Sequence, residues 1–242
     1  LYKNDKIDYI FANAGMICQG SKKNKNGLNE TFHVNHTGHF LLIDGVLQLL
    51  GKKHENRVIV QSSLAHWYHS KPICFEKYFR DESQESSSYY NAYADSKFAN
   101  ILFARKLDRV LKGVGKARAL AVHPGYAVTN INKNIVDKTW KQALSDMMNG
   151  NNRSLLLKLG YQLGLSQPTM LDAALCSLDA AFRENPFEFT GPSGPFELKG
   201  EAYAAKLDKE ALNEALQDKL WNMTEKYLRG QAQVSRESHD SH

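Results

Sequence analysis

The chain has 242 residues, of which 42% are hydrophobic and 24% are charged. This length is enough for one sizeable α/β domain with its own core, and the composition is ordinary for a soluble globular protein. The net charge is +5, and the scattered basic residues lack an accompanying stripe of aromatics, which argues against a nucleic-acid partner. The 3 cysteines lie far apart, which indicates a reducing compartment and not a disulfide framework.

Three short apolar segments bounded by turn residues predict buried strands at residues 7–12, 57–61 and 117–122. Helical patterns run between them, at residues 28–50 and 91–112. Strands separated by helices of this length imply βαβ units with right-handed crossovers. The predicted fold class is therefore α/β, with a parallel sheet and helices on both faces.

Later helices are expected near residues 139–159, 168–182 and 209–228, and a last edge strand at residues 196–198. Residues 231–242 are polar and are expected to form a disordered tail, so that a single domain spans residues 1–230. No segment approaches the ~18 apolar residues of a membrane span, and no signal peptide is visible. Because the chain enters a strand soon after Leu1, we expect a longer protein whose missing N-terminus would hold any membrane anchor.

Polar and turn-forming residues follow each of the three predicted strands. They are Asn13, Ala14 and Gly15 after the first, Ser63 after the second, and Pro124, Gly125 and Thr129 after the third. Each motif alone has an ordinary explanation as a turn or a helix cap. The carboxyl ends of parallel strands, however, meet at one edge of the sheet, where α/β folds bind ligands. Their common placement therefore predicts one site.

Tyr93 and Lys97 are four residues apart on a predicted helix, so they lie on one face, one turn from each other. A cation that close is expected to favour the phenolate, which makes the phenol a usable proton donor and acceptor near neutral pH. The spacing alone is weak evidence, because a packed tyrosine beside a surface lysine shows it too.

Asn35 lies in the middle of an apolar helical stripe. A buried amide there must find partners or destabilise the fold by ~1–3 kcal/mol. Two interpretations stay open for it. One is a structural bond to neighbouring backbone, and the other is a clamp for water or main chain beside an active site.

Taken together, these residues resemble the short-chain dehydrogenase/reductase family, and most closely its retinol dehydrogenase-like branch with the WW-domain-containing oxidoreductase. The segments that match are DYIFANAG, FHVNHTGHFLL, RVIVQSS, YNAYADSKFANILFARKL and LAVHPGYAVT. The resemblance covers residues 5–130 and implies a three-layer Rossmann-like sheet. The first strands of the family, with their glycine-rich phosphate loop, do not appear before Ile7.

The resemblance implies a role for each residue. Tyr93 would be the general acid/base, and Lys97 would tune it while bonding the nicotinamide ribose. Ser63 would orient the substrate oxygen, and Asn35 would support a proton-relay water. The cofactor-binding residues would be Asn13, Ala14 and Gly15 on the adenosine side, and Tyr93, Lys97, Pro124, Gly125 and Thr129 at the nicotinamide end.

The implied reaction is the NAD(P)-dependent interconversion of an alcohol and a carbonyl compound, with NADP placed ahead of NAD and no metal. The substrate would be small and lipophilic, like a retinoid or a steroid. We expect the protein in the cytoplasm or on the cytosolic face of an intracellular membrane. Because the missing strands would leave a sheet edge exposed, we also expect this chain alone to be poorly soluble or to dimerise by that edge.

Two other classes of protein were weighed against an oxidoreductase. A catalytically silent α/β scaffold that binds protein partners stays open, because half of the expected cofactor site is absent from the pattern. A hydrolase that uses Ser63 is disfavoured, since no base and acid partners follow this residue at recognisable spacing.

Overall fold

The computed structural model describes residues 7–17, 23–24, 28–49, 56–79, 89–113, 115, 117–125 and 170–239. Within these residues, 5 strands form one sheet in the order β1-β2-β3-β4-β5. They are β1 (Tyr9–Ala12), β2 (Arg57–Gln61), β3 (Arg118–Val122), β4 (Phe189–Pro192) and β5 (Ala202–Ala204). The first four strands pair in parallel, and β5 joins β4 antiparallel. The predicted α/β class and its first three strands are confirmed.

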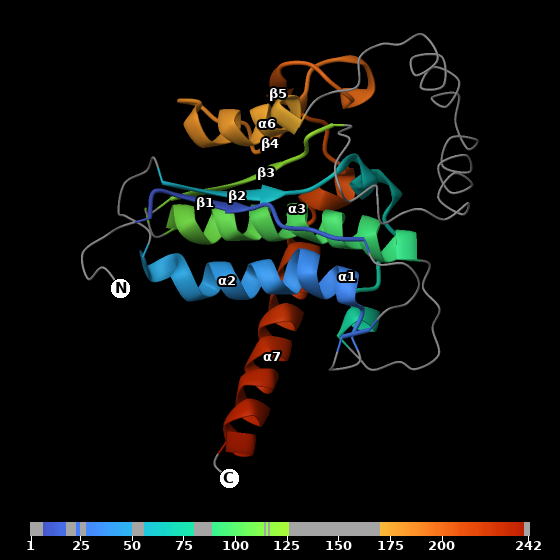
Figure 1. Cartoon of the computed structure of the whole chain (residues 1–242), viewed down its shortest axis with the longest axis vertical. Coiled ribbons are helices and arrows are strands. Elements are labelled where there is room, and N and C mark those ends of the chain that lie inside the picture. The colour runs from blue at the N-terminus through green and yellow to red at the C-terminus, as the bar shows by residue number, and fades with distance from the viewer. Residues whose placement is uncertain are drawn as a thin grey trace.

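Helices cover both faces of the sheet (Figure 1). On one face, α1 (Glu30–Phe32), a π-helical turn (His33–Thr37) and α2 (Gly38–Val46) run on from one another beside α3 (Tyr89–Gly113). On the other face lies α6 (Met170–Phe182). Shorter helical turns complete the described elements, and they are Leu47–Leu49, Leu64–Tyr68, Glu76–Tyr78, Pro195–Glu197 and Lys209–Leu212.

The apolar side of α3 forms the centre of the core. Phe98, Ile101 and Leu102 are fully buried, at a spacing that places them against the sheet. Polar side chains are buried on the same helix, among them Asp95 and Lys97. Buried charges on a helix that otherwise packs apolar residues require specific partners, and these partners define the site described below.

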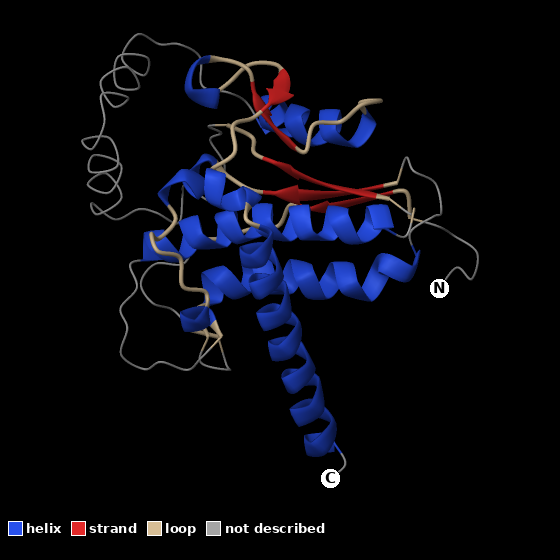
Figure 2. Ribbon diagram, turned by 180° about the vertical axis from the view of Figure 1, so that it is seen from behind, coloured by secondary structure: helices blue, strands red, loops and turns tan. Residues whose placement is uncertain are grey.

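The C-terminal helix α7 (Glu214–His239) crosses α3, and its outer part projects beyond the rest of the described protein (Figure 2). Trp221 anchors its inner part between the rings of Phe40 and Phe103. The helix continues through residues 231–239, where the sequence predicted a disordered tail. A polar segment can continue a helix that packing has already nucleated, since each added residue gains one hydrogen bond.

The last edge strand was predicted at the wrong place. Residues 196–198 belong to a tight turn in which Phe196 and Glu197 have φ of 57° and 56°, outside the β region. The strands are β4 and β5, on either side of that turn. The helix expected at residues 139–159 lies outside the described residues. No helix among the described residues is long and apolar enough to cross a membrane.

Candidate active site

Asn35 lies in the π-helical turn and is fully buried. Its Oδ1 accepts from the Met16 N–H at 2.8 Å, and its Nδ2 donates to the Met16 carbonyl at 3.0 Å and to Ser96 Oγ at 3.0 Å. The amide therefore ties the segment after β1 to α3. Turns of π-helix often occur at functional sites, because they redirect a side chain within a helix.

Gly15 is placed between Asn35 and Lys97. A Cβ at this position would lie 3.2 Å from Lys97 Nζ and 3.4 Å from Asn35 Oδ1. The missing side chain lets the backbone at the end of β1 approach the lysine. Asn13 and Ala14, the two preceding predicted residues, are exposed at the same strand end.

Lys97 is almost completely buried. Its Nζ lies 3.4 Å from the Gln61 carbonyl, which also accepts from Asn100 Nδ2 at 2.9 Å. Burial lowers the pKa of Lys97 from 10.5 to about 8. An ammonium group has three N–H donors, so one long, shared contact leaves capacity for further acceptors.

Tyr93 and Ser63 meet at the same edge of the sheet. Ser63 begins the turn that follows β2, and its Oγ accepts from the Ala65 N–H at 3.2 Å. Its side chain lies close enough to the Tyr93 phenol to act on the pKa of that phenol, which it lowers. Because the Ala65 N–H occupies a lone pair, the serine hydroxyl proton is free to point at the phenol oxygen.

The Tyr93 phenol does not have the lowered pKa that the sequence predicted. Burial raises its pKa above the ordinary value of 10.0, and the Ser63 hydrogen bond acts in the opposite, weaker direction. Lys97 Nζ lies over the tyrosine ring, 5.6 Å from its centroid. The desolvation of the phenol therefore outweighs any help from the cation in this arrangement.

Asp95 was missed in the sequence, although it lies between Tyr93 and Lys97. It is fully buried, and it accepts from the Tyr78 hydroxyl at 2.6 Å and from the Ser70 N–H and Oγ at 2.6 and 2.9 Å. Lys77 Nζ lies 3.1 Å from it. The carboxylate thus fixes the segment after β2 against α3. The sequence did contain a signal for this role, because Asp95 is an acidic residue between two small residues, Ala94 and Ser96.

The Pro124-Gly125 turn follows β3 and is half-buried. Gly125 has φ of 72°, a left-handed conformation that favours glycine. The Gly125 N–H donates to His123 Nδ1 at 3.2 Å. The remaining predicted residue, Thr129, lies outside the described residues. The structure therefore places nine of the ten predicted residues, all beside the ends of β1, β2 and β3 or on the helices packed against them.

The residues present fit a nicotinamide dinucleotide. The buried ammonium of Lys97 retains donor capacity that the hydroxyls of a ribose can satisfy, and Gly15 leaves its approach open. Among the described residues, no group of three or more His, Cys, Asp or Glu side chains could hold a metal ion.

Comparison with known proteins gave matches over about half of the chain. Retinol dehydrogenase 14 of Mus musculus is 36% identical over 135 residues, which are 56% of this chain and 39% of that protein. Short-chain dehydrogenase TIC 32 A of Brassica napus is 32% identical over 135 residues, 53% of this chain and 41% of that protein. The matched part thus spans about two fifths of the length of these curated relatives. No family model matches the chain.

One solved structure shares most of the described architecture. It is the crystal structure of an uncharacterised protein from Mycobacterium paratuberculosis, with a TM-score of 0.66 and 27% sequence identity. The match covers 94% of this chain and 69% of that one. In sequence, and in a parallel sheet with Ser63, Tyr93 and Lys97 at its edge, the chain is similar to the short-chain dehydrogenase/reductases, and in particular to the retinol dehydrogenases.

Proposed function

We propose that the protein is an NAD(P)-dependent oxidoreductase that interconverts an alcohol and a carbonyl compound, with Tyr93 as the general acid/base. One observation carries the proposal. The Ser63 side chain lies beside the Tyr93 phenol and lowers its pKa, while Lys97 Nζ lies 5.6 Å from the centroid of the tyrosine ring. A hydroxyl, a phenol and a buried cation that converge beside strand ends are suited to moving a proton to or from a substrate oxygen.

In the reductive direction Tyr93 donates a proton, and its phenol, whose pKa burial raises, is protonated near neutral pH. The raised pKa makes this phenol a weak acid, so donation depends on stabilisation of the phenolate by Ser63 and Lys97. The Ser63 hydroxyl, fixed by the Ala65 N–H, can hold the substrate oxygen beside the phenol. When the phenol has given up its proton, the Lys97 cation is placed to stabilise the negative charge that remains.

The bound dinucleotide supplies the hydride, and the protein supplies orientation and electrostatics. Lys97 would bind the ribose hydroxyls, and Gly15 would let the cofactor approach the end of β1. Asn35 would hold this strand end in place through Met16. The family resemblance favours NADP over NAD as the cofactor. The ratio of the dissociation constants of NADP and NAD tests this preference.

The proposed substrate is a lipophilic alcohol or carbonyl compound such as a retinoid. This part of the proposal rests on the relatives, because several of them are named retinol dehydrogenases. The leucines at positions 155–157, 159, 163 and 165, which could line an apolar pocket, lie outside the described residues.

Tyr93→Phe tests the proposal, with retinal and NADPH as the assay pair. Loss of the phenol should lower kcat by at least ~10²-fold, the size of a positioned acid/base contribution. Tyr203→Phe is the matched control, because Tyr203 lies far along the sheet on β5 and is exposed. Circular dichroism and the thermal midpoint should be unchanged for both variants.

Near-normal turnover of a folded Tyr93→Phe variant would remove Tyr93 from the mechanism. Failure of the unchanged protein to bind either dinucleotide would instead favour the catalytically silent scaffold. Lys97→Met separates these outcomes further, since it should weaken both turnover and dinucleotide binding.

A further inference from the structure

His123 connects the Pro124-Gly125 turn to a carboxylate on a distant loop. Its Nδ1 accepts from the Gly125 N–H at 3.2 Å, and its Nε2 lies 3.2 Å from Glu197 Oε2. A neutral imidazole that accepts at Nδ1 carries its proton on Nε2. That N–H lies within ion-pair distance of the carboxylate, although Nε2 makes no hydrogen bond in this geometry, so the negative charge beside it favours the proton on Nε2. The ring is thereby held in one tautomer and one orientation, as histidines paired with a carboxylate commonly are.

Glu197 belongs to a tight loop, residues 193–201, that we call the Glu197 loop. The loop closes on itself, because the Ser193 N–H donates to the Glu201 carbonyl at 2.8 Å and the Gly194 N–H to Lys199 at 3.0 Å. Glu197 Oε1 accepts from the Lys206 N–H at 2.9 Å, so both carboxylate oxygens have partners. The loop thus holds the carboxylate in a fixed direction, toward His123.

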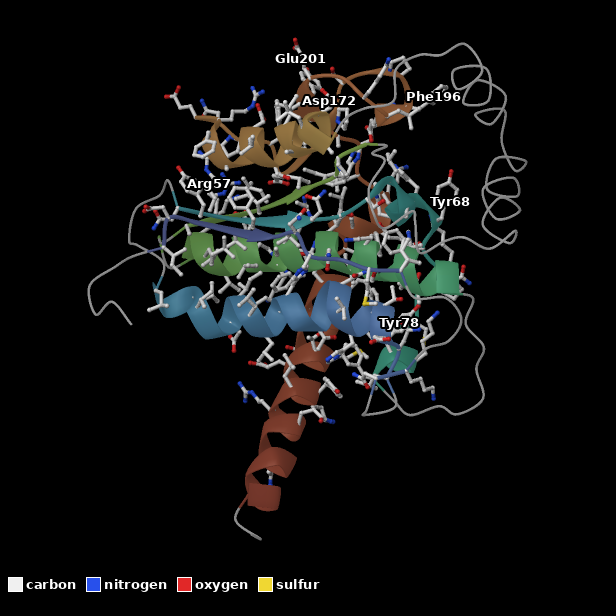
Figure 3. The ribbon with its side chains drawn as sticks, viewed as in Figure 1. Arg57, Tyr68, Tyr78, Asp172, Phe196 and Glu201 are labelled. Carbon is white, nitrogen blue, oxygen red and sulfur yellow. The ribbon has the colours of Figure 1, made fainter. Side chains whose placement is uncertain are left out.

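The backbone of the loop is strained at the residue that carries this carboxylate. Phe196 and Glu197 both adopt left-handed conformations, with φ of 57° and 56°. Such conformations in residues other than glycine persist only where the surroundings over-determine them, and they concentrate at functional sites. In Figure 3, Phe196 marks this turn, whereas Glu201 points away from the body of the protein.

Two glycines allow the loop, the histidine and the turn to interlock. A Cβ at Gly191, on β4, would lie 2.0 Å from His123 Nε2. Only glycine at this position therefore leaves space for the His123 ring, which follows β3. A Cβ at Gly125 would lie 2.4 Å from the Leu198 carbonyl oxygen. The turn after β3 therefore packs backbone to backbone against the Glu197 loop.

We propose that Glu197 is a positioning residue that fixes the Pro124-Gly125 turn through His123. Its carboxylate charge, 3.2 Å from Nε2, favours the proton on that nitrogen, which leaves the Nδ1 lone pair to bind the Gly125 N–H. The effect on cofactor affinity rests on the proposed function, because that function places this turn at the nicotinamide end. The effect on the turn itself does not depend on any activity.

The first experiment measures the turn without a cofactor. In protein with ¹⁵N-labelled histidine and backbone, the unchanged chain should show His123 as the Nε2–H tautomer and a slowly exchanging Gly125 amide. Glu197→Ala should give a mixture of tautomers and faster exchange at Gly125. Glu197→Gln should restore the unchanged pattern, because its amide oxygen places a partial negative charge at the same position beside Nε2.

Glu201→Ala is the matched control, since Glu201 lies in the same loop with an exposed side chain. An Ala variant at Glu197 that keeps both the tautomer and the slow exchange would overturn the proposal, and so would a Gln variant that behaves like Ala. Should Glu197→Ala fail to fold, Glu197→Asp carries the same test. Its side chain is one methylene shorter and withdraws from Nε2.

The second experiment is a titration with NADPH. If the released turn spends about a tenth of its time in the bound geometry, Kd should rise about tenfold in Glu197→Ala and stay unchanged in Glu201→Ala. An unchanged Kd in a variant with an altered tautomer would overturn the link from Glu197 to the cofactor. If the unchanged protein binds no dinucleotide, the proposed function fails, and the magnetic resonance result still decides the role of Glu197 in the turn.

Discussion

The side chain of Asn35 holds the backbone of Met16 with both of its polar atoms. The Met16 N–H and carbonyl are satisfied by one amide from a residue 19 positions away. The same amide nitrogen reaches Ser96 on α3. The backbone at Met16 lies beyond the end of β1, and this one buried side chain binds it where strand pairing has stopped. The same side chain links that backbone to the helix that bears Tyr93.

Replacing Asn35 with alanine should destabilise the protein by about 2–3 kcal/mol, because the contacts of its buried amide with the half-buried backbone of Met16 and with Ser96 would be lost. Asn213→Ala is the control, since its Oδ1 caps an exposed helix end by accepting from the Leu216 N–H at 3.2 Å. That loss should cost only about 1 kcal/mol. Urea unfolding curves measure both, and equal effects would show that the Asn35 amide is not a special contact.

The lowered pKa of Lys97 predicts a specific dependence of stability on pH. The folded protein releases the Lys97 proton near pH 8, whereas the unfolded chain keeps it to about 10.5. Between these values the unfolded state binds more protons, so the contribution of Lys97 to the free energy of unfolding rises with pH. Over the full window the rise is about 3 kcal/mol.

Urea unfolding of the unchanged protein and of Lys97→Met, from pH 6 to 10.5, measures this contribution as the difference between them. The difference should be flat below pH 8 and should rise above it in favour of the unchanged protein. A difference that stays flat across the window would show that the Lys97 ammonium is solvated or paired in the folded state.

Gly191→Ala should be strongly destabilising, because the added methyl group would overlap the His123 ring that it contacts at 2.0 Å. A displacement of the ring or of β4 should cost about 1–3 kcal/mol, as overpacking of a well-packed core does. Gly45→Ala is the matched control. Nothing lies within 4 Å of a Cβ at that helical position, so this change should stabilise the protein by about 0.5–1 kcal/mol.

Thermal midpoints of the two glycine variants decide this prediction. Equal shifts in the same direction would show that His123 and β4 yield readily to the extra methyl group.

The sequence predicted the parts of the fold that carry a strong local pattern. Strands β1, β2 and β3 are continuous apolar runs, as buried parallel strands are, and the spacing of apolar residues located α3. Strand β4 was missed because Gly191 and Pro192 read as a turn. Its pairing with β3 and β5 makes this segment a strand, and pairing between separate segments leaves no local signal.

The site was predictable as a set of residues but not as a set of contacts. Tyr93, Ser63 and Lys97 could be located by their places at strand ends and on one helix. The direction of the Tyr93 pKa shift could not be predicted from the sequence, because it depends on how deeply the phenol is buried. Glu197 had no signal in the sequence, since its role depends on a left-handed turn 74 positions from His123.

The buried carboxylate of Asp95 also bears on how this protein could acquire new specificity. Tyr78 and Ser70 donate hydrogen bonds to it. Tyr68 and Cys74 are exposed and make no hydrogen bond to this carboxylate. Changes at the exposed positions can reshape this surface without shifting the helix that bears Tyr93. Variants and libraries built on this chain should therefore accept changes most readily at the exposed positions, with Tyr78 and Ser70 left unchanged.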